Sequence, residues 1–117
     1  MGRAVSKGPK LVERTDCVSE LAKFFSGAVP VKIPVRVIKG DPVNGAPAEQ
    51  TSIEFGTSSE VLFVSSLPLD FDDTVRVLNS DGSLDIAAKV VAMRFHRGKM
   101  AVAARFLEDV ANWIIKA

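Results

Sequence analysis

Hydrophobic and polar residues alternate with a period of two along most of the chain from about residue 29 onward. In "VPVKIPVRVIK" (29–39), every second residue from Val31 to Val37 is apolar, and the residues between them are basic or proline. This alternation is typical of a strand with one buried face. Pro30 and Pro34 have no N–H group to donate, so we expect one side of this strand to be an edge of the sheet.

Further strand patterns follow at close spacing and are separated by turn residues. They cover about 51–55, 60–65, 74–79, 83–95 and 99–106. A loop rich in Gly, Pro and Asn precedes the first of them, and Asp81-Gly82 and Arg97-Gly98 mark tight turns between the last ones. Consecutive strands joined by short turns predict an antiparallel sheet. The expected fold is a small all-β barrel of about six strands.

Two of the predicted strands are apolar on both faces. In 60–65 both alternating sets are apolar, and in 83–95 a second apolar set accompanies the one predicted to face inward. The inward set is Leu84, Ile86, Ala88 and Val90, and the outward set is Val91, Met93 and Phe95. A strand that is apolar on both faces needs cover on both. We therefore expect terminal helices or a second copy of the chain to cover the outside of the barrel.

Short helices are predicted on both sides of the strand region. From about 15 to 26, apolar residues recur at helical spacing, and Gly27 ends the pattern. At the C-terminus, "EDVANWIIKA" places Val110, Trp113 and Ile114 on one face of a short helix. We expect these three residues to form a surface that a protein partner or a second copy of the chain covers.

Length and charge indicate one domain, at 15–117, preceded by a flexible basic arm at 1–14. The arm carries a net charge of +3, whereas the whole chain of 117 residues carries only +1. The near balance gives no overall field that would draw the protein onto nucleic acid or anionic lipid. One cysteine excludes an internal disulfide, and no apolar run has membrane-spanning length. We expect a cytoplasmic protein that does not insert into membranes.

The order of the strands in 29–106 resembles that of a PilZ domain, a small β-barrel of bacterial proteins that respond to cyclic di-GMP. "VPVKIPVRV" is similar to the first strand of that family, and "TSIEFGTSSEVLFVSSLPL" to its short strand, serine-containing turn and following hydrophobic strand. "LPLDFDDTVRVLN", "LDIAAKVVAMRF" and "MAVAARF" resemble its later strands, so that the resemblance covers about two thirds of the chain. It implies a PilZ-like barrel and a role in bacterial signalling related to cyclic di-GMP.

Two motifs hold cyclic di-GMP in the PilZ family, and both are altered in this chain. The first is Arg-x-x-x-Arg just before the first strand, where guanidinium groups suit phosphate and guanine; here the segment reads "FFSGA" (24–28). The second, Asp/Asn-x-Ser-x-x-Gly, aligns with "FGTSSE" (55–60), in which only Thr57 resembles its counterpart. Glu60 replaces the glycine and would repel a dianionic ligand. Losing two charge-assisted arginine contacts costs about 3–6 kcal/mol.

We therefore predict a non-catalytic PilZ-like module that works through protein partners or self-association, without a cofactor and with weak or no direct binding of cyclic di-GMP. Thr57 and Ser59 are the candidates for any contact that the turn still makes with the ligand. An alternative is a functional cyclic di-GMP receptor that uses replacement basic residues. Two pairs copy the spacing of the arginine motif, namely Lys10 with Arg14 and Lys32 with Arg36.

A further alternative is a binder of single-stranded nucleic acid, because small barrels with aromatic and basic residues bind oligonucleotides. The basic candidates are Arg36, Lys39, Arg94, Arg97, Lys99 and Arg105. The chain has no tyrosine, so nucleic acid is not the expected partner. An enzyme is not expected either, because one His, one Cys and no Gly-rich phosphate loop supply neither a catalytic constellation nor a metal site.

Overall fold

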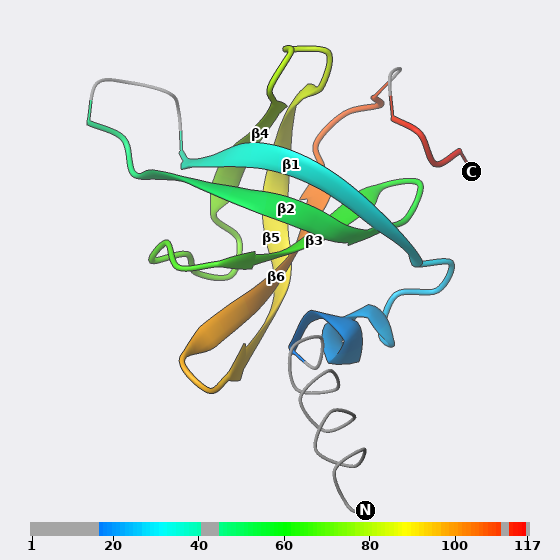
Figure 1. Cartoon of the computed structure of the whole chain (residues 1–117), viewed down its shortest axis with the longest axis vertical. Coiled ribbons are helices and arrows are strands. Elements are labelled where there is room, and N and C mark those ends of the chain that lie inside the picture. The colour runs from blue at the N-terminus through cyan, green and yellow to red at the C-terminus, as the bar shows by residue number, and fades with distance from the viewer. Residues whose placement is uncertain (1–16, 41–44, 111–112, 117) are drawn as a thin grey trace, which may run out of the picture.

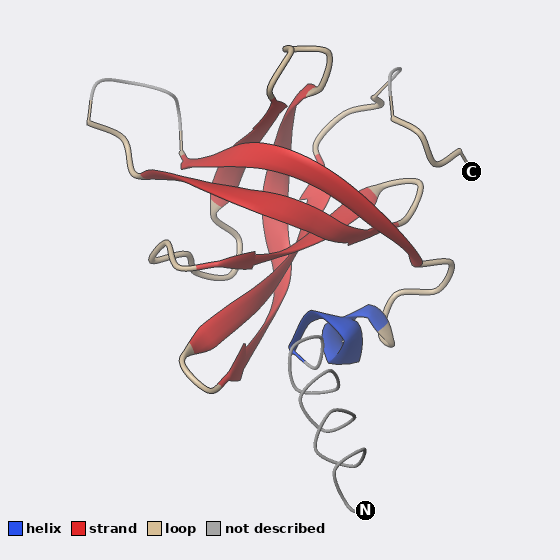
Figure 2. Cartoon of the chain, in the orientation of Figure 1, coloured by secondary structure: helices blue, strands red, loops and turns tan. Residues whose placement is uncertain are grey.

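Six antiparallel strands form a closed barrel in the computed structural model, which describes residues 17–40, 45–110 and 113–116 (Figures 1 and 2). The strands are β1 (Val29–Lys39), β2 (Ala48–Gly56), β3 (Glu60–Ser65), β4 (Thr74–Asn79), β5 (Asp85–His96) and β6 (Lys99–Phe106). They lie in the order β1-β2-β3-β6-β5-β4, and pairing of β4 with β1 closes the barrel. The predicted antiparallel barrel is confirmed. The arm at 1–14 lies outside the described residues.

Strand β1 has a neighbour on each side over only part of its length. Its register with β2 spans Val29–Ile38, whereas its pairing with β4 covers only Val35–Lys39. Gly40 N–H donates toward the β4 side, to the carbonyl of Thr74 at 2.7 Å. Because hydrogen-bonding direction alternates along a strand, Pro34 faces that same side. The edge that the prolines predict therefore exists, but only over the first half of the strand.

The inner core fills the inside of the barrel with the apolar face of every strand. All residues predicted to face inward in 31–37 and 84–90 either belong to this core or pack against it. Its members with no exposed surface are Val37, Ile53, Val61, Phe63, Val75, Val77, Ala88, Val90, Val102 and Ala104. The alternation along the sequence thus identified the inside of the barrel correctly for these strands.

An outer core covers β3 and β6 on the outside of the barrel. Leu62 of β3 and Ala101 and Ala103 of β6 are buried there against the helix at residues 17–22. The helix contributes Cys17, Val18, Leu21 and Ala22. It lies beside the outer face of the strands in Figure 1, next to the β5–β6 hairpin. A helix therefore covers a strand that is apolar on both faces, as the sequence predicts.

This helix ends earlier than the predicted boundary at residue 26. The backbone N–H groups of Lys23, Phe24 and Phe25 each donate to the carbonyl three residues before them, at 3.0–3.3 Å. Such bonds tighten the last turn into a non-α conformation. Gly27 then adopts a φ of 80°, which turns the chain toward β1.

A β-bulge in β5 reverses which side chains face the inside of the barrel. The register between β5 and β6 shifts by one residue between Val90 and Ala92, so that Val91 is an extra residue in β5. A shift of one residue moves every following side chain to the opposite face. Met93, predicted to face outward, therefore packs against the inner core, while Val91 packs against the outer core as predicted. Phe95 remains 73% exposed.

The C-terminal segment is not the helix that its apolar spacing predicts. Its described residues, 107–110 and 113–116, are not helical. The segment instead packs against the end of the barrel where β2 and β6 finish, and Trp113 joins the inner core with 2% of its surface exposed. A helix would have kept Val110 and Ile114 on the tryptophan's face, whereas the observed contacts turn Trp113 inward and leave Ile114 64% exposed. No helix within the described ranges is long and apolar enough to cross a membrane.

Candidate functional site

The loop between β2 and β3 occupies the position at which the resemblance places the second ligand motif. Its ends are joined by a hydrogen bond from Thr57 N–H to the carbonyl oxygen of Glu60, at 3.0 Å. The Thr57 hydroxyl oxygen accepts the backbone N–H groups of Ser59 at 3.1 Å and Glu60 at 2.9 Å. Thr57 is 6% exposed, and its hydroxyl donates to the Glu60 carboxylate. This threonine therefore stabilises its own turn.

Glu60, at the position of the motif glycine, is paired with the neighbouring strand. It is 8% exposed and lies directly opposite Arg105 in the register of β3 with β6. Arg105 Nε and Nη2 lie 2.9 and 2.8 Å from Oε2 of Glu60, while Oε1 accepts the hydroxyl of Thr57. Both carboxylate oxygens are used within the protein. Since Arg105 is engaged with Glu60, it does not substitute for a missing motif arginine.

The C-terminal segment packs against one end of this loop through Trp113. The indole Nε1–H of Trp113 donates to the carbonyl oxygen of Thr57 at 2.6 Å, and the ring lies edge-on to Phe106 with centroids 5.5 Å apart. A Cβ atom added to Gly56 would lie 2.7 Å from Cζ2 of Trp113. The ring therefore rests directly on the glycine backbone at the end of β2.

A cavity of about 490 Å³, which we call the loop cavity, lies between this loop and the C-terminal segment. Its apolar lining is Phe106, Leu107, Val110 and Ile115, and its polar lining is Ser58, Ser59, Glu108, Asp109 and Lys116. The polar lining includes two acidic residues and one lysine, and no arginine contributes to it. The predicted candidates Thr57 and Ser59 are thus separated, because Ser59 is exposed at this cavity and Thr57 is buried in the turn.

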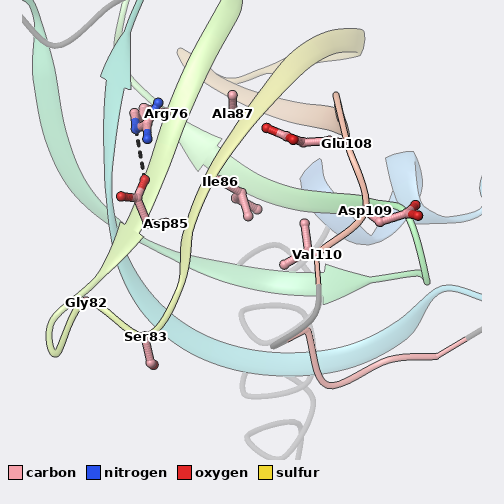
Figure 3. Close-up of a pocket in the computed structure, with 9 residues that line it drawn as sticks. All are labelled: Arg76, Gly82, Ser83, Asp85, Ile86, Ala87, Glu108, Asp109 and Val110. Carbon is pink, nitrogen blue, oxygen red and sulfur yellow. Dashed lines mark hydrogen bonds and ion pairs between the residues drawn. The ribbon is translucent and has the colours of Figure 1, made fainter.

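A second cavity, of about 370 Å³, lies between the C-terminal segment and the β4–β5 hairpin (Figure 3), and we call it the hairpin cavity. Figure 3 shows the Glu108 carboxylate directed toward β5, with Val110 next to Ile86 and with Asp109 directed away. On the opposite side, Arg76 Nε donates to the Asp85 carboxylate at 2.8 Å. The lining residues include three acidic residues and one arginine, and of the carboxylates Asp85 is paired with Arg76 while Glu108 points toward β5.

Of the residues predicted to replace the motif arginines, the structure describes only Lys32 and Arg36, and neither contributes to the loop cavity. Lys10 and Arg14 are outside the described residues. Lys32 and Arg36 are both exposed on β1, and neither lines the loop cavity or the hairpin cavity. Arg36 lies opposite Gln50, toward the end of β2 that is far from the loop.

The three residues predicted to form one apolar surface have different environments. Trp113 is buried, Val110 is half-buried against the inner core, and Ile114 is exposed. The predicted shared face depended on a helix that the described residues do not form. Ile114 is the most exposed of the three, and Val110 keeps part of its surface open at the two cavities.

The sequence did not indicate that Arg105 and Glu108 belong to this region, and it placed Gly56 in the 55–60 segment without predicting its contact with Trp113. Arg105 and Glu60 are 45 residues apart in the sequence and meet because β3 pairs with β6. No local sequence pattern predicts that pairing. Gly56 carried a signal, because glycine at a strand position often marks the close approach of another group. Glu108 lines a cavity because of the path that the C-terminal segment takes after β6, and the sequence did not predict that path.

No group of three or more His, Cys, Asp or Glu side chains in the described ranges is arranged to hold a metal ion. A scan against protein-family models and a search of curated proteins each found no match to this chain. The resemblance to PilZ domains therefore stays a prediction.

Proposed function

We propose that this chain is a non-catalytic, PilZ-like interaction module whose 55–60 segment stabilises the barrel and binds cyclic di-GMP weakly or not at all. One observation carries the proposal: the polar groups of the segment are already used within the chain. Thr57 bonds to its own turn, Glu60 to Arg105, and the Thr57 carbonyl to the indole of Trp113.

A dinucleotide at this position would have to replace these contacts. Hydrogen bonds to charged groups contribute about 1.5–3 kcal/mol each, and the Glu60 carboxylate takes part in several. The ligand's phosphates would also meet the carboxylates of the loop cavity. Because no arginine lines that cavity, little interaction energy is available to offset these costs.

Exposed apolar side chains support a role in binding other proteins. The large apolar residues that are at least 42% exposed among the described ones are Phe24, Val29, Phe71, Phe95, Leu107 and Ile114. Three of them are phenylalanine, a residue type enriched at protein interfaces. In the proposed role, the barrel is a rigid scaffold, stabilised by the inner core, and a partner binds the exposed apolar side chains on its surface.

Calorimetric titration with cyclic di-GMP tests this function. We expect no saturable binding up to about 1 mM ligand, the range in which binding free energy falls to about 4 kcal/mol. A micromolar dissociation constant would overturn the proposal. Loss of such binding in K10A/R14A or in K32A/R36A would then establish the receptor alternative. K39A/K89A removes the same number of charges at side chains that line neither cavity and serves as the matched control.

A further inference from the structure

The hairpin between β5 and β6 carries an exposed aromatic ring and basic side chains at its end. It extends away from the barrel toward the lower left of Figure 1. Phe95 is 73% exposed, and Arg94 and Lys99 are exposed and make no direct ion pair with another described residue. The Glu20 carboxylate of the neighbouring helix, whose pKa is lowered mainly by Lys23, also lies within range of the Arg94 charge. We call Arg94, Phe95 and Lys99 the basic tip. The segment from 94 to 99 contains no acidic residue.

The turn within this hairpin keeps a basic residue in an unfavourable conformation. Arg97 has φ 54° and Gly98 has φ 78°. Two successive positive φ angles define a type I′ turn, whose first position ordinarily holds Asn, Asp or Gly. The left-handed conformation is costly for a residue such as arginine, and strain of this kind is concentrated at functional positions.

The basic tip presents different chemistry on its two faces. Successive residues of a strand point to opposite faces, so Phe95 lies on one face and Arg94 on the other. Lys99 is paired with His96 and therefore shares the face of Arg94. A partner that receives this hairpin must offer apolar contact to one face and negative charge to the other.

The hairpin cavity offers both kinds of contact. Ile86, Ala87 and Val110 supply apolar surface, and the Glu108 carboxylate is directed into the cavity (Figure 3). The Arg76–Asp85 pair forms the opposite side. Charge and apolar character therefore match those of the basic tip.

The basic tip and the hairpin cavity lie at opposite ends of the molecule. In Figure 1 the β5–β6 hairpin extends downward, whereas the β4–β5 turn and the C-terminal segment lie at the top. We propose that copies of this chain associate head to tail, with the basic tip of one copy docked in the hairpin cavity of the next. This inference rests on the proposed role as an interaction module and names its partner. Because the two surfaces differ, the contact is heterologous and can repeat from copy to copy.

The proposed contact is small, so association is weak and sensitive to salt. A single hairpin end buries less than the roughly 1,200 Å² typical of stable complexes. Exposed charge pairs are also screened by salt, with a Debye length of about 10 Å at 0.1 M. We therefore expect a dissociation constant on the order of 0.1 mM at low salt.

Sedimentation velocity of the full chain over a concentration series tests the inference through charge reversal. R94E/K99E makes the tip acidic, and E108K/D109K makes the cavity basic. Each variant alone should associate at least about tenfold more weakly than the original chain. An equimolar mixture of the two should associate again, because it supplies an acidic tip for the basic cavity and an original tip for the original cavity. K32E/R36E and E54K/D70K change the charge by the same amounts elsewhere and should leave association unchanged.

Phe95→Ala tests the apolar part of the contact, and it should weaken association without changing the net charge. A chain that stays monomeric up to about 1 mM at low salt overturns the inference, as does association that survives both reversals or is not restored in the mixture. A labelled oligonucleotide, or vesicles containing phosphatidylserine, that bind the original chain and the cavity variant but not the tip variant would assign the tip to a polyanion instead. None of these outcomes bears on the proposed lack of dinucleotide binding, which only the ligand titration tests.

Discussion

Adding one methyl group at Gly56 tests the contact between the β2–β3 loop and the C-terminal segment. In Gly56→Ala, the new Cβ would lie 2.7 Å from Trp113 Cζ2 and 2.9 Å from Ile115 Cδ1. The isoleucine methyl is the end of a flexible side chain and can rotate away. The indole is held by its bond to the Thr57 carbonyl and by the edge of Phe106. The ring must therefore shift as a unit or the strand end must move.

The expected cost follows from two opposing effects. Overpacking a filled site ordinarily costs about 1–3 kcal/mol. Alanine in place of glycine restricts the unfolded chain and returns about 0.5–1 kcal/mol. We expect a net loss of about 1–2 kcal/mol in the free energy of unfolding. In a domain of this size, each kcal/mol lowers the melting temperature by about 4 °C.

Intrinsic fluorescence is a local probe for this variant, because the chain has one tryptophan and no tyrosine. Displacement of Trp113 should shift its emission to longer wavelength and expose it to a soluble quencher, while the far-ultraviolet circular dichroism of the barrel is retained. Urea unfolding followed by both signals gives the free energy. In a Trp113→Ala background, the same glycine substitution should cost less than about 0.5 kcal/mol, because the clash is gone.

Two results would refute this reasoning. Gly56→Ala with unchanged emission and an unchanged urea midpoint would show that the ring does not rest on the glycine. An equal cost in the two backgrounds would place the strain in the strand itself and not at the indole.

Two further predictions concern single side chains. Trp113→Ala should destabilise the protein by about 3–5 kcal/mol because it removes a ring that is 2% exposed, and a circular-dichroism melt left unchanged by the substitution would contradict its place in the core. Burial raises the pKa of the Glu49 carboxyl, but hydrogen bonds from the Ser65 and Ser66 hydroxyls and from the Ser66 N–H outweigh burial and lower this pKa below 4.5. A lowered folded-state pKa gives stability that is present above the unfolded value and is lost as the pH falls through the folded one. Glu49→Gln should therefore lower the urea midpoint at about pH 7, and its difference from the original chain should disappear as the pH falls through the folded-state pKa of Glu49.

Local patterns were sufficient to predict the strands of this barrel and one helix that covers them. The alternation in β1 identified Val35 and Val37 as inward residues, and the second apolar face of β3 predicted that Leu62 needed a cover. Both inferences depend only on neighbouring residues and on the need to bury apolar surface. The β-bulge at Val91 has no such local signal, so the orientation of Met93 was wrong.

The candidate site was predicted less well, because its contacts join distant parts of the chain. The sequence indicated that the 55–60 turn departs from the ligand motif, but not that Arg105 would pair with Glu60. The prediction of a C-terminal helix was wrong. The apolar spacing of the segment favours a helix, but Trp113 instead packs at the end of the barrel and donates a hydrogen bond to the Thr57 carbonyl. Tertiary contacts of this kind override a short stretch of helical periodicity.

The half-paired first strand has a consequence for aggregation. An unpaired side of a strand ordinarily recruits strands from other molecules and so starts cross-β growth. Within the part of the chain that the structure describes, no strand pairs with the β4-facing side of β1 before Val35, and Pro34 removes a donor from that side. A strand that adds to this part of β1 would find no backbone N–H at Pro34 and would form one hydrogen bond fewer. This loss discourages fibril formation by strand addition there.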